Sequence, residues 1–343
     1  MGAFDGLRGG QISSGYWGNH TGTIDWCELN YTHSPLIAEF YNTLTNLPVI
    51  LLGVYGALNT ASSGVQWRFA LLYLGLSLIG IGSFGFHASL RWEWQLMDEL
   101  PMIYVVSYAA YLVLDTLPSF KPRFGIWGPL VLLSWDVFVT LSYICLPNPI
   151  YHQVAFAFIL LSCILRNVFL LRGLPPRAAH PARSMITRYM IMGILTFAAG
   201  FAIWNVDNIF CEHLRRARVP LGPWGFLLQG HGYWHLMTGV GSFWIFTASI
   251  YLQLAVKVSP QAYTFDDTAW FPTVRAVLPA KGERADGARE VPGKAAVGIA
   301  AAPGANGQAI ARQTSANAVK DRRNEKEEDK QMDEKVKVKA GKQ

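Results

Sequence analysis

Residues 67–87, WRFALLYLGLSLIGIGSFGFH, decide the fold, because they contain no Asp, Glu or Lys and only one Arg, at position 68. A bilayer core takes about 20 apolar residues as a helix. Six further stretches have this length and composition: 37–58, 98–117, 125–145, 149–171, 187–210 and 233–256. Breaks such as Leu146-Pro147-Asn148-Pro149 separate them. A backbone in lipid must satisfy its hydrogen bonds internally, and no barrel-like alternation is present, so the sequence predicts an all-α, seven-transmembrane helix bundle.

The composition separates an apolar body from a polar tail. The chain has 343 residues and is 51% hydrophobic but only 15% charged, against about 25% charged in soluble domains. Residues 281–343 hold 24 charged residues and no Phe, Trp or Tyr, too few large side chains for a core. A single soluble domain is therefore excluded. We expect three parts: a lumenal segment 1–36, a membrane domain 37–256, and a cytosolic, largely disordered tail 257–343.

Charge also indicates orientation and partners. With a lumenal N-terminus, eight Lys or Arg residues of the body fall on the cytosolic side and five on the other, a modest positive-inside bias. We therefore expect a lumenal N-terminus and a cytosolic C-terminus. The body carries only +2 of the total charge of +6, so no nucleic-acid partner is expected, and no obligate protein partner is evident.

Three histidines fall at one predicted edge of the membrane. Ser83 and His87 close the second span at a spacing of four, and His231 and His235 open the seventh at the same spacing, which puts each pair on one helix face. Asp98 opens the third span at that edge. Three imidazoles with an open fourth position suit a catalytic zinc, which lowers the pKa of its water to about 7. Asp98 is then a candidate proton shuttle, and Ser83 a donor to an oxyanion.

Other interpretations of these histidines stay open. Each could be an ordinary interfacial or core histidine. A haem with two histidine ligands is the alternative to zinc as the bound metal group. Intramembrane ionisable residues are nevertheless costly and mark function, so metal binding is favoured.

Hard oxygen ligands gather before the first span. Asp25, Glu28, Asn30 and Glu39 lie within 15 residues and suit Ca²⁺, although the residues alone favour a helix cap with solvated acids, and their spacing does not match an EF-hand loop. Glu39 also begins a polar stripe with Asn42 and Asn46, which is expected to face the bundle interior. Asn205 and Asp207, near the lumenal end of the sixth span, are candidate partners of the metal ligands.

Taken together, these motifs resemble the alkaline ceramidases. The set Ser83-x-x-x-His87, Asp98 and His231-x-x-x-His235 is typical of a seven-helix hydrolase superfamily that includes the adiponectin receptors. The segment Asp25-Trp26-Cys27-Glu28-x-Asn30 resembles the ceramidase branch. The similarity runs from about residue 15 to about 256.

The resemblance implies a zinc-dependent amidase that cleaves ceramide in the bilayer, phytoceramide or dihydroceramide above all, into a sphingoid base and a fatty acid. It implies zinc ligands His87, His231 and His235, with Asp98 acting on the zinc-bound water and Ser83 assisting. It implies a calcium ion coupled to the zinc, with these ligands: Asp25, the Trp26 carbonyl, Glu28, Asn30 and Glu39. It also implies an endoplasmic reticulum or Golgi membrane. The rivals are a receptor of the adiponectin-receptor branch and a non-enzymatic protein with a structural metal.

Two cysteines are candidates for a disulfide. Cys27 precedes the first span and Cys211 follows the sixth, on the same predicted side. A lumenal location permits a Cys27–Cys211 bond, for which chain-entropy models give roughly 4–5 kcal/mol. Two free thiols are the alternative.

Overall fold

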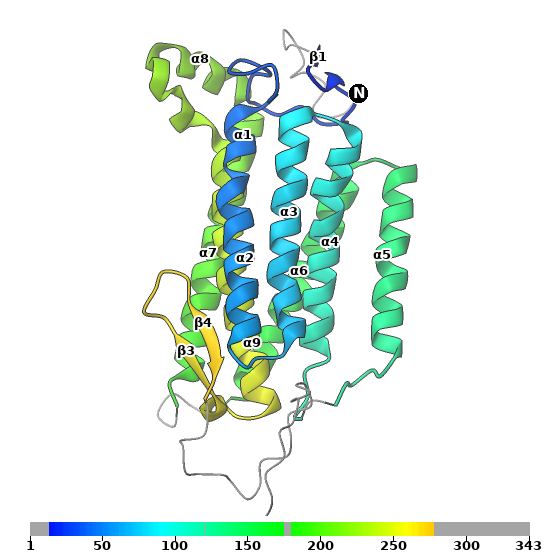
Figure 1. Ribbon diagram of the computed structural model, residues 1–343, viewed down its shortest axis with the longest axis vertical. Coiled ribbons are helices and arrows are strands. Elements are labelled where there is room, and N and C mark those ends of the chain that lie inside the picture. The colour runs from blue at the N-terminus through cyan, green and yellow to red at the C-terminus, as the bar shows by residue number, and fades with distance from the viewer. Residues whose placement is uncertain (1–13, 120, 175–179, 278–343) are drawn as a thin grey trace, which may run out of the picture. The chain divides into compact units, whose positions relative to one another are not determined.

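The computed structural model describes residues 14–119, 121–174 and 180–277 (Figure 1). Within these ranges nine α-helices form the body of the protein. Their bounds are α1 Phe40–Leu44, α2 Asn46–Ser62, α3 Ala70–Ser89, α4 Trp92–Leu114, α5 Trp127–Cys145, α6 Pro149–Arg172, α7 Ala182–Ile209, α8 Cys211–Leu221 and α9 Gly230–Lys257. The short 3-10 helices are η2 Trp67–Phe69, η3 Gly222–Leu228 and η4 Pro260–Ala262. Two antiparallel hairpins complete the fold, β1 Ser14–Gly15 with β2 Gly18–Asn19, and β3 Tyr263–Asp266 with β4 Thr273–Ala276.

The expected seven-helix bundle is confirmed, because seven helical segments are long and apolar enough to cross a membrane. The first span combines α1 with α2, and the second combines η2 with α3. The third span starts at Trp92, six residues before its expected start at 98, so Asp98 lies in the second turn of α4. The chain is therefore a multi-pass membrane protein.

Helix α9 is the centre of the bundle. It packs against α7, α2, α6 and α3, and its second half is buried almost continuously from Thr247 to Ala255. By contrast α5 packs mainly against α4 and exposes apolar side chains on most of its surface, as a lipid-facing helix does. The two histidines of the seventh span thus sit on the most enclosed helix of the protein.

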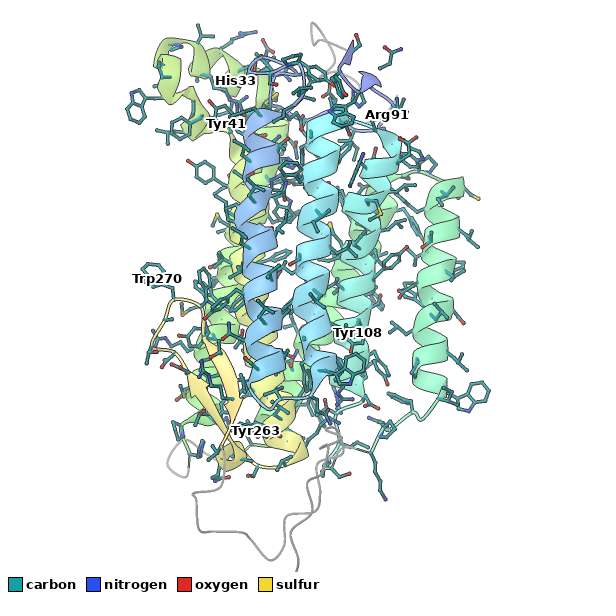
Figure 2. All side chains as sticks on the ribbon, in the orientation of Figure 1. His33, Tyr41, Arg91, Tyr108, Tyr263 and Trp270 are labelled. Carbon is teal, nitrogen blue, oxygen red and sulfur yellow. A yellow bond between two sulfur atoms is a disulfide. The ribbon has the colours of Figure 1, made fainter. Side chains whose placement is uncertain are left out.

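The N-terminal segment is held across one end of the bundle. Leu90 ends α3 in the left-handed conformation, with φ 52°. Its carbonyl accepts hydrogen bonds from the backbone N–H groups of Thr21 and Gly22 at 3.1 and 3.0 Å. Further along, the N–H groups of Ala38 and Glu39 donate to the last carbonyls of α3, each at 2.9 Å. We call this end, where Tyr41 and Arg91 lie in Figure 2, the histidine end.

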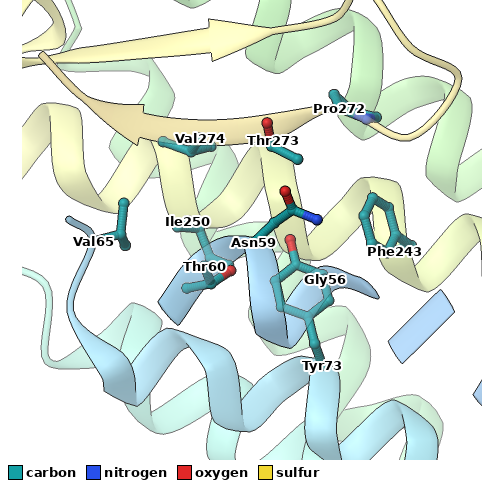
Figure 3. A pocket seen from close by; sticks show the side chains of 10 residues that line it. All are labelled: Gly56, Asn59, Thr60, Val65, Tyr73, Phe243, Ile250, Pro272, Thr273 and Val274. Atoms are coloured by element: carbon teal, nitrogen blue, oxygen red, sulfur yellow. The ribbon is translucent and has the colours of Figure 1, made fainter. Parts of the chain in front are cut away.

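The β3–β4 hairpin covers the helices toward the opposite end, where Tyr263 lies in Figure 2. Figure 3 shows strand β4 over α2 and α9, with Val274 above Ile250 and Tyr73. The cavity left between them is about 10 Å³, room for one water molecule. The ordered chain thus continues beyond the membrane domain expected to end at 256, while the remainder of the expected tail, from 278, lies outside the described residues.

Candidate active site

Three histidines from distant parts of the chain meet at the histidine end. His87 comes from the last turns of α3, and His231 and His235 come from the first turns of α9. Their ring centroids lie 4.7–4.9 Å apart, and one candidate ligand atom from each lies within 4.8 Å of the others. All three are buried. This arrangement is a cluster that can hold one metal ion.

The hydrogen bonds around the rings leave nitrogens available for that ion. The Glu39 carboxylate contacts Nδ1 of His87, while Nε2 of the same ring has no hydrogen-bond partner among the described residues. The Thr45 hydroxyl lies 2.9 Å from Nδ1 of His235 and uses its own hydrogen on the Tyr41 carbonyl, so it can accept from Nδ1–H. Metal-binding histidines donate their other N–H in this way. The residues present therefore fit a metal ion bound at Nε2 of both rings.

Ser83 and Asp98 lie beside the cluster. The Ser83 hydroxyl is 3.4 Å from Nε2 of His235 and accepts from Nδ2 of Asn46 at 3.1 Å, and the Asp98 carboxylate lies near enough to interact with it. Gly82 makes this approach possible, because a Cβ at that position would overlap the Met97 carbonyl of α4. The polar stripe predicted to face inward does so, since Glu39, Asn42 and Asn46 are all buried.

The four oxygen-bearing side chains expected near the N-terminus also come together. Asp25, Glu28, Asn30 and Glu39 are all buried. Nδ2 of Asn30 donates to Asp25 at 3.2 Å. Both oxygens of Glu28 accept backbone N–H groups at the start of α1, each at 2.8 Å. Buried carboxylates gathered at one point are the donor set of a hard cation such as Ca²⁺.

The charges within this carboxylate cluster oppose one another. Burial first, and then the Glu39 carboxylate, raise the pKa of Glu28 from 4.5 to about 8. Burial and the neighbouring Asp25 raise the pKa of Glu39 well above its usual range. A bound divalent cation would remove this repulsion, so the residues present fit one.

Trp26 lies between the two clusters. Its ring packs on His231, with centroids 4.5 Å apart, and its backbone N–H donates to the Glu39 carboxylate at 3.3 Å. Its carbonyl accepts from Nη2 of Arg215 at 3.3 Å, and a carbonyl oxygen keeps a second lone pair for a cation. The contacts of Trp26 thus connect the carboxylate cluster with the histidine cluster.

A disulfide and two arginines hold this segment to the bundle. Cys27 and Cys211 are bonded to each other. Nε of Arg215 and Nη1 of Arg218 both donate to the Cys27 carbonyl at 3.0 Å. The remaining cysteines of the described chain, Cys145 and Cys163, are free. Helix α8 therefore holds the segment that carries Asp25, Glu28 and Asn30 against the bundle.

Asp207 fixes the start of the helix that carries two of the histidines. Its Oδ1 accepts from the Gly230 N–H and from Arg218, both at 3.1 Å. A Cβ on Gly230 would lie 2.8 Å from the Asp207 side chain, so this contact requires glycine. Asn205, the other candidate partner, instead bonds back to the Phe201 carbonyl at 2.7 Å.

Three residues that contact the site were not predicted from the sequence. Thr45 immediately precedes Asn46 and so falls off the polar stripe that drew attention to α1 and α2. Arg215 and Arg218 share one face of α8 at a spacing of three. That spacing was the available signal, but it acquires meaning only once the segment is known to be helical.

Comparison with known proteins identifies the chain's relatives. Residues 18–279 match the family described as Ceramidase. The chain is 35% identical over 252 residues to "Alkaline ceramidase 3" of Mus musculus, covering 71% of this chain and 90% of that protein. It is 33% identical over 258 residues to "Alkaline ceramidase YPC1" of Saccharomyces cerevisiae, covering 70% and 79%. It is 29% identical over 230 residues to "Alkaline ceramidase" of Arabidopsis thaliana, covering 67% and 83%.

Proposed function

From the premise that this chain belongs to the alkaline ceramidase family, we propose that it hydrolyses ceramide at a zinc site formed by His87, His231 and His235. The observation that carries this proposal is the buried triad of imidazoles, with Ser83 and Asp98 beside it. Three protein nitrogens with a further open position are the ligand set of a catalytic zinc. When bound there, zinc supplies Lewis acidity and lowers the pKa of water to about 7.

The side chains beside the triad have distinct roles in this proposal. Hydrolysis of the amide adds the hydroxyl of water to the acyl carbon and a proton to the departing amine. Asp98 accepts the proton from water and passes it to the amine, which is general base and then general acid catalysis. The Ser83 hydroxyl, held by Asn46, donates a hydrogen bond to the oxygen of the amide as negative charge develops. The products are a sphingoid base and a free fatty acid.

The carboxylate cluster holds a calcium ion in our proposal. The ligands are Asp25, Glu28, Asn30, Glu39 and the Trp26 carbonyl. Like-charged, buried carboxylates support this assignment, because burial first and then their mutual repulsion raise the pKa of Glu28 and Glu39 when no cation is bound. The proposed calcium ion stabilises the N-terminal segment and influences the histidine cluster through Glu39, which contacts His87 directly.

We propose an orientation with the histidine end in the lumen of the endoplasmic reticulum or Golgi and the C-terminus in the cytosol. The Cys27–Cys211 disulfide supports it, because such bonds persist in oxidising compartments. We further propose phytoceramide or dihydroceramide as the preferred substrate. Dihydroceramide differs from ceramide by one double bond, and phytoceramide by one hydroxyl. A strong preference for phytoceramide requires a polar group placed to meet that hydroxyl.

The test uses purified full-length protein and a panel of ceramide, dihydroceramide and phytoceramide. We expect fatty acid release that chelation abolishes and zinc restores, together with zinc bound in stoichiometric amount. Fatty acid release that survives complete removal of zinc would contradict the zinc site. Equal rates on the three lipids would contradict only the substrate preference.

A further inference from the structure

Helix α8 and η3 form a helical hairpin that stands apart from the seven spans. In Figure 1, α8 projects from the histidine end, beside the start of α1. A disulfide and two arginines attach it to the rest of the protein. Cys211 of α8 is bonded to Cys27, Arg218 donates to Cys27 and Asp207, and Arg215 donates to Cys27 and Trp26. Arg218 also donates to the Leu228 carbonyl within the hairpin.

The rest of the hairpin has two unlike surfaces. On one, Glu212 and Arg216 form an exposed ion pair at a spacing of four, with 64% and 74% of their side chains exposed. The other begins at Leu221, five residues after Arg216 and so on the opposite side of α8, and continues through η3. Residues 221–228, LGPWGFLL, carry no charge. Four large apolar side chains of this run are between 38% and 64% exposed, and we name them the α8–η3 patch: Leu221, Trp224, Phe226 and Leu227.

The α8–η3 patch continues a surface that already faces lipid. The Phe226 ring stacks on Tyr41 of α1, with centroids 6.0 Å apart, and Tyr41 lies at the histidine end in Figure 2. Below it on the first span, Leu44 and Leu47 are exposed. At the end of α7, which joins α8, Ile209 and Phe210 are exposed as well. An exposed apolar surface of this kind marks an interaction site. Because the adjoining surface of the first span contacts lipid, the partner of this surface is the bilayer.

We propose that the α8–η3 patch is a lipid-binding element that enters the headgroup region of the bilayer at the histidine end. Trp prefers this region because its ring is apolar and its N–H is polar, and a helix with one charged and one apolar surface lies in it. Since η3 leads directly into Gly230, which Asp207 holds, lipid contact fixes the depth of the first turn of α9. The amide of a ceramide lies at that depth. This proposal depends on the membrane-spanning fold and not on the zinc or calcium assignment.

A matched pair of labels on opposite surfaces of α8 tests it, because Leu221 follows Arg216 by five residues. Full-length protein carrying Cys145→Ser and Cys163→Ala, which leaves the disulfide intact, receives either Leu221→Cys or Arg216→Cys. Each is labelled with an environment-sensitive fluorophore and placed in phosphatidylcholine nanodiscs. We expect a nitroxide high on the acyl chain to quench the label at 221 severalfold more than the label at 216, and aqueous iodide to do the reverse. Equal quenching at the two positions by both agents would overturn the proposal.

An activity measurement provides the second readout. The double variant Leu221→Asp with Trp224→Asp should raise KM severalfold for ceramide presented in phosphatidylcholine vesicles. Its kcat on ceramide in mixed detergent micelles should stay unchanged, which shows that the variant folds. An unchanged KM in vesicles, or an equal loss in micelles, would contradict a role in lipid contact.

Discussion

Glu39 and His87 join the two candidate metal sites through a direct contact. The Glu39 carboxylate meets Nδ1 of His87, and the Glu39 N–H donates to the His87 carbonyl at 2.9 Å. The other carboxylate oxygen of Glu39 accepts from Trp26, within the carboxylate cluster. A single buried side chain therefore contacts a histidine of the cluster on one side and belongs to the proposed calcium ligand set on the other.

The first prediction concerns that contact. Glu39→Gln keeps the size of the side chain but weakens the acceptor that holds His87, so we expect zinc affinity to fall by about 10–100-fold, as for other partners of metal ligands. Calcium affinity should fall as well. Zinc and calcium content of the purified protein measure both. Glu93→Gln is the control, because Glu93 is exposed on α4 at the same end. Unaltered zinc affinity in Glu39→Gln would contradict the coupling.

The second prediction concerns the histidine cluster. His235→Ala should remove bound zinc and abolish fatty acid release together, because two remaining imidazoles bind zinc poorly. His213→Ala is matched to it, since His213 is an exposed histidine on α8 outside the cluster. That variant should retain both zinc and activity. Full turnover by His235→Ala would exclude the proposed site.

The third prediction concerns Asp207. Asp207→Ala leaves the N–H group of Gly230, next to His231, without its acceptor and removes the partner of Arg218. We expect kcat to fall about tenfold or more as His231 loses its position, with a parallel loss of zinc affinity. Asn205→Ala, two residues away, should have little effect because Asn205 bonds only within its own helix. Comparable effects of the two substitutions would refute a positioning role.

The fourth prediction concerns the disulfide. Cys27→Ser should lower the free energy of unfolding, because loss of a native disulfide costs about 2–5 kcal/mol. Thermal unfolding in detergent, with and without reductant, measures it. Reductant should lower the Tm of the parent protein and of Cys145→Ser, but not that of Cys27→Ser. Mass mapping that finds Cys27 and Cys211 as free thiols in membranes would overturn this expectation.

The fifth prediction concerns pH. Because the pKa of Glu28 is about 8 without a cation, a proton must leave before calcium binds. Apparent calcium affinity should therefore rise with pH and level off above about 8, by up to about tenfold per pH unit for each proton released. The stability of the calcium-free protein should instead fall as pH rises. The pKa of Glu28 in the folded state exceeds its ordinary value of 4.5, so the contribution of Glu28 to stability is lost as pH rises from 4.5 to about 8.

Calcium titration calorimetry at several pH values checks the fifth prediction. Thermal unfolding in chelator at the same pH values checks the stability of the calcium-free protein. An affinity that is constant below pH 8 would show that no carboxyl group in the cluster is protonated when calcium binds.

The helices were predictable because lipid leaves few alternatives. A span such as 67–87 has no polar group to satisfy its backbone except its own, so length and composition suffice. The spacing of His231 and His235 put both on one face, and the parity of the spans put them at the same edge as His87. Such inferences need only helix geometry.

The hairpin of α8 and η3 was not predictable in the same way. Residues 211–228 combine charges with prolines, which are typical of a loop. Their structure depends on contacts of Arg218 with Asp207 and Cys27, residues distant in the sequence. Thr45 was missed for a related reason, because its partner His235 lies 190 positions away. No local pattern carries that information.

The order in which the chain is synthesised limits when the site can form. Its residues are synthesised at three stages. The carboxylates are complete by residue 39, and His87 and Asp98 follow with the second and third spans. His231 and His235 come only with the last span. The partner of Cys27, Cys211, follows the sixth span and precedes the last. Until the sixth span is complete, the nascent chain has Cys27 without its bond, and until the seventh is inserted it has a single histidine of the cluster. A ribosome that stalls before residue 235 leaves a membrane protein unable to assemble the site, so hydrolysis cannot begin on an incomplete chain.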